Sequence, residues 1–233
     1  NNVHKVKDII SETSKKTVFY VTSPADCSSL YEPNLDVFSK YSFLSHVTSF
    51  TMKEVDTITL EELYVSEKIK FPLPSYIQLD LQGGEISALR GAGNCFLQNA
   101  MLITTEACLV PLYKKQPLLP DYISYFYSKG YNLLDLGEVR ASHSRDIFSE
   151  FDYSIAKIGA KDLYTDLTFI RTKPPCCIKE LAGLIISLLI EYRYSDIIDI
   201  CSQHDFIMNN AMRSTVNRMQ YEVKKNISKC WIF

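Results

Sequence analysis

Residues 74–85 constrain the fold of this chain more than any other stretch. Apolar residues run up to Asp80, Gly83 and Gly84 follow almost at once, and a helical pattern begins at Glu85. This order predicts a buried strand that ends at Asp80, a tight turn that needs glycine, and the start of a helix. In an open α/β sheet, ligands bind just outside the carboxyl ends of the strands. The sequence therefore places Asp80 at a candidate binding site.

Strand and helix patterns alternate along most of the chain. Runs rich in β-branched and aromatic residues predict strands, and apolar residues spaced by three and four predict amphipathic helices. Such alternation is typical of an α/β fold with a mostly parallel sheet. We expect strands over residues 17–22, 47–60, 74–80, 101–106, 131–136 and 163–171, and helices from Glu85 and over residues 122–127.

A boundary is expected at residues 173–175, where two prolines in a row disfavour both a helix and a central strand. Everything beyond them has helical periodicity. We therefore expect one α/β domain over residues 1–173 and an all-α C-terminal extension over residues 174–233. Within the first domain, Thr59 and Glu62 have the spacing of a capping box that begins a short helix.

The composition is that of an ordinary globular protein, with 46% hydrophobic and 22% charged residues. A net charge of −2 argues against a nucleic-acid-binding protein, which usually carries a basic excess. The apolar runs are too short for a membrane span. Seven cysteines without a regular spacing, and no signal-peptide pattern, favour a reduced, cytoplasmic setting.

Acidic residues at two neighbouring strand ends are the main candidates for chemistry. Asp80 ends one predicted strand and Glu106 ends the next, so the two carboxyls could share a site and orient a hydroxyl or accept its proton. Glu85 begins the helix after Asp80. The alternatives are structural: Glu85 as an acid favoured by the helix dipole, and Glu106 as a carboxylate that fixes a loop.

Several familiar motifs are not supported by the sequence. Gly91 and Gly93 do not form a dinucleotide-binding loop, since Phe96 occupies the third glycine position and the pair falls within or at the end of a helix. The four histidines have no metal-ligand spacing, so we expect no metal site. His143 could serve as a base, but an exposed loop histidine is the better explanation.

Four short motifs occur in a fixed order between residues 15 and 173. They are Cys27-Ser28-Ser29-Leu30, Val55-Asp56-Thr57-Ile58-Thr59-Leu60, Ile77-Gln78-Leu79-Asp80-Leu81-Gln82-Gly83-Gly84-Glu85 and Val110-Pro111-Leu112-Tyr113 with Gln116-Pro117. Together they resemble the FkbM family of S-adenosylmethionine-dependent methyltransferases. Gln82 stands where that family commonly has Glu.

The resemblance implies a class I methyltransferase fold, which is Rossmann-like with a seven-stranded sheet. It also implies transfer of a methyl group from S-adenosylmethionine to a hydroxyl of a sugar or a natural-product-like acceptor. The implied roles are catalysis for Asp80, Glu85 and Glu106, cofactor binding for Asp80, Gln82 and Gly83, and substrate binding for Ser28, Ser29 and Tyr113.

One part of the family pattern is missing from the sequence. The glycine-rich cofactor loop should precede Cys27, and the chain begins with Asn1 and shows no such loop. We therefore expect residues 1–173 to be the C-terminal portion of a methyltransferase domain that is incomplete at its N-terminus. The alternatives are a non-catalytic binding or scaffold module with this fold, and a carbohydrate-modifying enzyme that uses Asp80 and Glu106. The helical extension could also mediate a homo-oligomer.

Overall fold

The computed structural model describes residues 7–42, 44–66, 73–142, 160–204, 213–215 and 217–218. These residues belong to two compact units, Asn1–Thr172 and Lys173–Phe233. His143 and residues 205–212, 216 and 219–233 of the expected helical extension lie outside the described residues.

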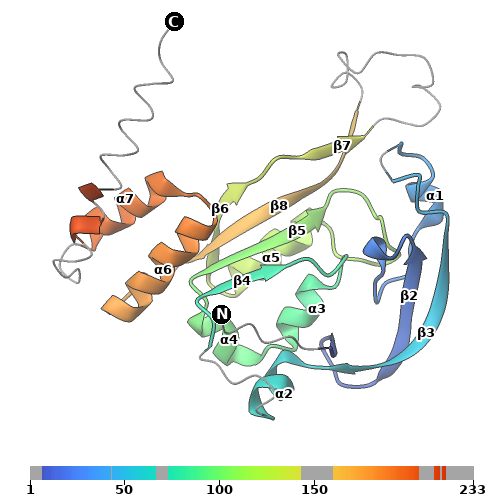
Figure 1. The fold of residues 1–233 in the computed structure, drawn as a ribbon, viewed down its shortest axis with the longest axis horizontal. Helices are drawn as coiled ribbons and strands as arrows, with labels where there is room; N and C mark the ends of the chain where they lie inside the picture. Colours follow the sequence, from blue (N-terminus) through green and yellow to red (C-terminus); the bar gives the residue numbers. More distant parts are fainter. Residues whose placement is uncertain are drawn as a thin grey trace, which may run out of the picture. The chain divides into compact units, whose positions relative to one another are not determined.

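A five-stranded sheet forms the centre of the first unit (Figure 1). Its strands are β4 (Tyr76–Leu79), β5 (Leu102–Cys108), β6 (Tyr131–Leu136), β7 (Arg140–Ser142) and β8 (Lys161–Arg171). They are ordered β4-β5-β8-β6, and β7 also pairs with β8. The pair β4–β5 is parallel, whereas β8 runs antiparallel to β5, β6 and β7.

The expectation of a mostly parallel sheet is wrong. The strands β5 and β6 do run in the same direction, as the strand–helix–strand pattern predicts, but they are not neighbours. Strand β8 lies between them and pairs antiparallel with both. The order of strands and helices along the chain predicts the direction of successive strands. It does not predict that a later strand pairs between two of them. The fold is therefore mixed α/β, with sheets that are largely antiparallel.

A second, smaller sheet precedes this one in the chain. Its strands are β1 (Ile9–Ile10), β2 (Lys16–Ser23) and β3 (Ser49–Ile58), in the order β1-β3-β2. The long pair β2–β3 is antiparallel, with a register from Lys16 opposite Asp56 to Ser23 opposite Ser49. Between these two strands lie the 3-10 helix η1 (Ala25–Cys27) and the short helix α1 (Leu35–Phe38).

Helix α2 (Leu60–Val65) begins with the predicted capping box, which is confirmed. The Glu62 backbone N–H donates to Thr59 Oγ1 at 3.0 Å, and the Thr59 N–H donates to the Glu62 carboxylate at 3.3 Å. Two backbone N–H groups that lack a partner inside the helix are thereby satisfied. A local sequence signal was sufficient here because both partners lie within one turn.

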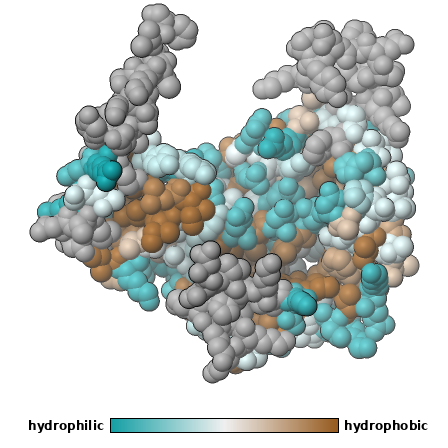
Figure 2. Space-filling view, viewed as in Figure 1, coloured by the Kyte–Doolittle hydropathy of each residue, from teal (hydrophilic) through white to brown (hydrophobic). Residues whose placement is uncertain are grey.

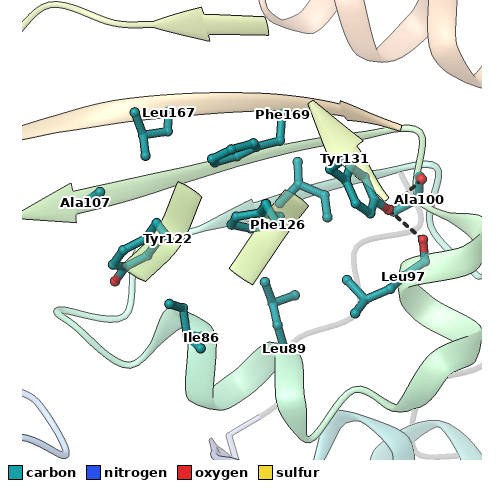
Figure 3. Packing of buried hydrophobic residues seen from close by; sticks show 11 residues of the cluster. Ile86, Leu89, Leu97, Ala100, Ala107, Tyr122, Phe126, Tyr131, Leu167 and Phe169 are labelled. Carbon is teal, nitrogen blue, oxygen red and sulfur yellow. Dashed lines mark hydrogen bonds between the residues drawn. The ribbon is translucent and has the colours of Figure 1, made fainter. Parts of the chain in front are cut away.

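Three helices pack on the five-stranded sheet: α3 (Glu85–Arg90), α4 (Gly93–Asn99) and α5 (Leu119–Ser128). Their main core cluster is shown in Figure 3. Phe126 of α5 stacks on Phe169 of β8, with ring centroids 4.1 Å apart. The Tyr131 hydroxyl lies near the end of α4, at 2.5 Å from the Leu97 carbonyl oxygen and 2.8 Å from that of Ala100. Complete burial of each large apolar side chain contributes about 1.5–3 kcal/mol.

The helix expected from Glu85 is interrupted at Gly91, which separates α3 from α4. A Cβ at Gly91 would lie 2.3 Å from the Ser11 carbonyl oxygen. Glycine is required there because the backbone just after β1 passes directly over the helix end. This close packing explains Gly91 without any cofactor.

The second unit contains α6 (Ile178–Ile190) and α7 (Tyr194–Gln203), which pack on each other. Helix α6 also exposes the apolar side chains of Ile178, Ile186 and Ile190, and Figure 2 shows apolar surface over this helix. Among the described residues, no helix has the length and apolar character that crossing a bilayer requires.

Candidate functional site

The candidate site is built around the turn that follows β4. Asp80 comes directly after this strand, as predicted, and the turn then passes through two residues of positive φ, Gln82 at 52° and Gly83 at 92°. A side chain at Gly83 would also crowd Gln116, whose Cβ would lie 3.3 Å from the added Cβ. Glycine at this position lets the chain reverse tightly into α3, as the sequence suggests.

The buried side chain of Glu85 stabilises this turn by accepting hydrogen bonds from its backbone. Its side chain is buried, and Oε1 accepts hydrogen bonds from the Leu81 N–H at 2.7 Å and the Gly83 N–H at 3.2 Å. The other oxygen accepts a 2.6 Å hydrogen bond from the Tyr122 hydroxyl. Burial raises the pKa of Glu85, and these hydrogen bonds oppose that rise. The residue is more than an acid at a helix start, because it ties the turn to α5.

Gln82 is the hub of a hydrogen-bond network. Its Nε2 donates to Asp80 Oδ1 at 2.7 Å, and its Oε1 accepts from the Tyr113 hydroxyl at 2.8 Å. Its backbone carbonyl accepts from the Ser29 hydroxyl at 2.7 Å. The side-chain amide therefore holds Asp80 in place and links it to the loops that carry Ser29 and Tyr113.

The three residues expected to bind substrate differ in their surroundings. Ser29 and Tyr113 are each only 1% exposed, and their hydroxyls bond to protein groups. The Ser28 hydroxyl donates to the Ala25 carbonyl at 2.6 Å, but Ser28 also lines a cavity. Ser29 and Tyr113 thus hold the site together, whereas Ser28 lies where a ligand can reach it.

Three acids lie in a row across neighbouring strands. Glu106 is inside β5 rather than at its end, because the strand continues to Cys108. Leu79 pairs with Thr105, so extending this register by one residue sets Asp80 beside Glu106. On the other side, Glu106 is directly opposite Asp166 of β8. Like charges in these positions repel each other.

This repulsion and burial together raise the pKa of Glu106 to about 8. Burial is the larger cause, and the neighbouring carboxyls of Asp80, Glu85 and Asp166 add to it. Among the residues that the structure describes, no hydrogen bond or ion pair engages the Glu106 side chain. A carboxyl with such a pKa exchanges protons near neutral pH and can act as a general base or acid. The nearby Cys27 thiol is not a comparable nucleophile, because burial and acidic neighbours raise its pKa to about 11.

A cavity of about 340 Å³ opens at the end of β4. Its lining includes Asp80, Gln82 and Ser28 from the predicted set, together with Phe19 and apolar side chains. The charged residues in its lining are all acidic: Asp8, Asp26 and Asp80. The cavity therefore favours neutral or cationic ligands over phosphorylated ones.

Sequence reasoning missed three residues of this site: Asp26, Tyr122 and Asp166. A signal for Asp166 was available, since it is the one charged residue between Leu163 and Ile170 of β8. Tyr122 looked like any other apolar position on the face of α5. Its bond to Glu85 spans 37 positions of the sequence and depends on the tertiary fold.

A comparison with family models decides the affiliation of the chain. The model described as the methyltransferase FkbM domain matches residues 5–133, more than half of the 233 residues. The chain belongs to the FkbM methyltransferase family. No curated protein and no solved structure matches it.

The FkbM match contains almost the whole site. The turn after β4, the Gln82 network and Glu106 all lie inside it. Asp166 lies beyond the end of the matched segment, on β8, which follows that segment in the sequence and pairs with β5. The third acid of the row therefore comes from outside the matched segment.

Proposed function

We propose that this chain is an S-adenosylmethionine-dependent O-methyltransferase with a class I fold. Its acceptor is an uncharged hydroxyl compound, such as a sugar or a natural product of similar polarity. The observation that carries the proposal is the acidic cavity at the end of β4, lined by Asp80, beside which the β4–β5 register sets the Glu106 carboxyl. Membership of the FkbM family supplies the reaction class.

The residues present suit a cationic cofactor. Asp80, at the end of β4, would face its positive charge. When bound, S-adenosylmethionine supplies an electrophilic methyl group. The side chains that line the cavity offer no cation of their own to repel it.

The residues of the chain align the acceptor and remove the proton of its hydroxyl. Glu106 in its carboxylate form accepts the proton of the acceptor hydroxyl, which makes that oxygen a better nucleophile. Burial, together with the neighbouring Asp80, raises the pKa of Glu106 toward this task, and Gln82 holds Asp80 in place. Glu85 acts as a positioning residue, because its carboxylate is occupied by the turn and by Tyr122.

Calorimetric titration with S-adenosylhomocysteine and S-adenosylmethionine tests the cofactor. It should be done on this chain and on a version extended upstream, with Asp80→Asn as the test variant and Asp56→Asn, an exposed strand residue, as the control. We expect Asp80→Asn alone to weaken binding. Absence of binding by both versions would refute the cofactor assignment and favour a non-catalytic scaffold.

Transfer of labelled methyl groups tests the acceptor and the base. Neutral sugars should be methylated and their phosphate esters should not, since the cavity is lined with acids. Glu106→Gln should reduce turnover roughly 10²–10⁴-fold, the usual worth of a general base. Equal turnover in Glu106→Gln would remove this residue from the mechanism.

A further inference from the structure

Two loops of the first unit bring three different donor groups together. The carboxylate of Asp26, the thiol of Cys27 and the imidazole of His46 have donor atoms that all lie within 4.8 Å of one another. Asp26 and Cys27 belong to η1, just after β2, and His46 comes just before β3. The pairing of Ser23 with Ser49 brings these two loops side by side.

Both loops are anchored in the same core cluster. Leu44 and Val47, which flank His46, are buried there at 5% and 2% exposure, and Cys27 packs against this cluster. The backbone carbonyl of Cys27 also accepts a 3.0 Å hydrogen bond from the Tyr113 hydroxyl. The three donors are thus held near one another by packing.

The donor set matches the chemistry of zinc. Thiolate, imidazole and carboxylate are all zinc ligands, whereas calcium and magnesium prefer oxygen donors alone. Donor atoms around tetrahedral zinc lie about 3.5 Å apart, so small side-chain rotations would close this cluster around an ion. Three protein ligands leave a fourth position open, and Asp26 lines the acidic cavity described above.

The surrounding charge also favours a dication. Asp80 lies near enough to the Cys27 thiol to interact with it electrostatically. We propose that Asp26, Cys27 and His46 form a zinc-binding site with an open coordination position at the edge of this cavity. Regular spacing along the sequence does not reveal it, because the ligands come from two loops that only the β2–β3 pairing joins. The proposal is independent of methyl transfer.

A second group in the chain provides a matched control. Cys176, Cys177 and Glu180 of the second unit also bring two thiols and a carboxylate within 4.8 Å. Both thiols are exposed, at the start of α6. A metal ion that bound to any accessible thiol, without a preformed site, would bind Cys176 and Cys177 at least as well as Cys27.

Titration of the full chain with Co²⁺, followed by displacement with Zn²⁺, tests the site. We expect one equivalent of Co²⁺ with a thiolate charge-transfer absorption that Zn²⁺ abolishes. Cys27→Ser should remove the absorption. His46→Ala removes a metal ligand, so it should weaken Co²⁺ binding at least about 100-fold. That factor is the upper end of the loss in metal affinity when a residue that hydrogen-bonds to a ligand is mutated. The double variant Cys176→Ser/Cys177→Ser should bind as the parent chain does.

Two outcomes would overturn the proposal. One is the absence of stoichiometric binding by the parent chain. The other is binding that survives His46→Ala but is lost in the Cys176→Ser/Cys177→Ser variant. Because His46 is exposed, His46→Ala should keep the parent circular dichroism spectrum, and it decides the question even if Cys27→Ser does not fold.

Discussion

Tyr122 of α5 donates a 2.6 Å hydrogen bond to the buried carboxyl group of Glu85 at the start of α3. The same carboxyl group accepts two backbone N–H groups of the turn after β4. One buried acid therefore joins helix α5 to the turn that follows Asp80. The geometry of the candidate site depends on this contact even though Tyr122 is not among the residues that line the cavity.

Tyr122→Phe is expected to destabilise the protein by about 1.5–3 kcal/mol, the usual value for a hydrogen bond to a charged group. The ring still fills its place in the core, so the loss reports the hydroxyl alone. Urea unfolding measures it. Tyr127→Phe on the same helix, where the side chain is 54% exposed, should change the free energy of unfolding by less than about 0.5 kcal/mol. Equal effects of the two changes would mean that the Glu85 contact is unimportant.

Glu106→Gln is expected to change the pH dependence of stability. The folded-state pKa of Glu106, about 8, lies above its ordinary value of 4.5, so the folded protein keeps a proton that the unfolded chain releases. Stability that comes from this group is present below pH 4.5 and is lost as pH rises to about 8. Glutamine cannot ionise, so the variant does not lose this stability. Relative to the parent, its free energy of unfolding should increase by a few kcal/mol as the pH is raised from 5 to 9, at about 1.4 kcal/mol per pH unit below the folded-state pKa.

Urea unfolding at the two pH values measures this gain. Glu54→Gln, which changes an exposed acid in β3, provides the control and should show no such trend. A stability difference between Glu106→Gln and the parent that stays constant from pH 5 to pH 9 would contradict the raised pKa.

Gln82 is expected to show backbone strain, because its φ is 52° and it is not glycine. Gln82→Gly and Gln82→Ala both lose the bonds to Asp80 and Tyr113, but only alanine keeps the unfavourable conformation. The glycine variant should therefore be the more stable of the two by about 1 kcal/mol. Thermal or urea unfolding gives the difference. At Asp56, in ordinary extended backbone, the order should reverse and alanine should be the more stable.

Gly91→Ala is expected to displace the chain at Ser11, since the new Cβ would lie 2.3 Å from its carbonyl oxygen. Overpacking of this kind costs about 1–3 kcal/mol. Amide exchange at Ser11, whose N–H bonds to the Ile58 carbonyl at 3.1 Å, should accelerate. In Gly130→Ala the added Cβ meets no atom within 4 Å, and its cost comes from the φ of 80° instead, so it should destabilise the protein without a selective acceleration of exchange at Ser11. Unaltered protection in Gly91→Ala would mean that the close approach does not hold in solution.

Local features of this fold could be predicted from the sequence. The strand up to Asp80, the glycine turn and the helix from Glu85 were all predicted from one stretch of twelve residues, and the Thr59 capping box from four. In each case the interacting groups are close in sequence, so propensity and turn chemistry decide the conformation.

Features that depend on distant parts of the chain could not be predicted in this way. The place of β8 between β5 and β6 sets Asp166 opposite Glu106, and no local pattern encodes that choice of neighbour. Likewise, the bond from Tyr122 to Glu85 and the meeting of Cys27 with His46 exist only because separate elements pack together.

The row of acids formed by Asp80, Glu106 and Asp166 is expected to couple ligand binding to the release of protons. A positively charged ligand in this place lowers the pKa of Glu106, so at neutral pH its arrival expels a fraction of a proton into the solvent. The apparent enthalpy of binding then depends on the ionisation heat of the buffer, and affinity increases with pH up to about 8. Binding of a cation at this site would therefore be an exchange of that cation for a proton.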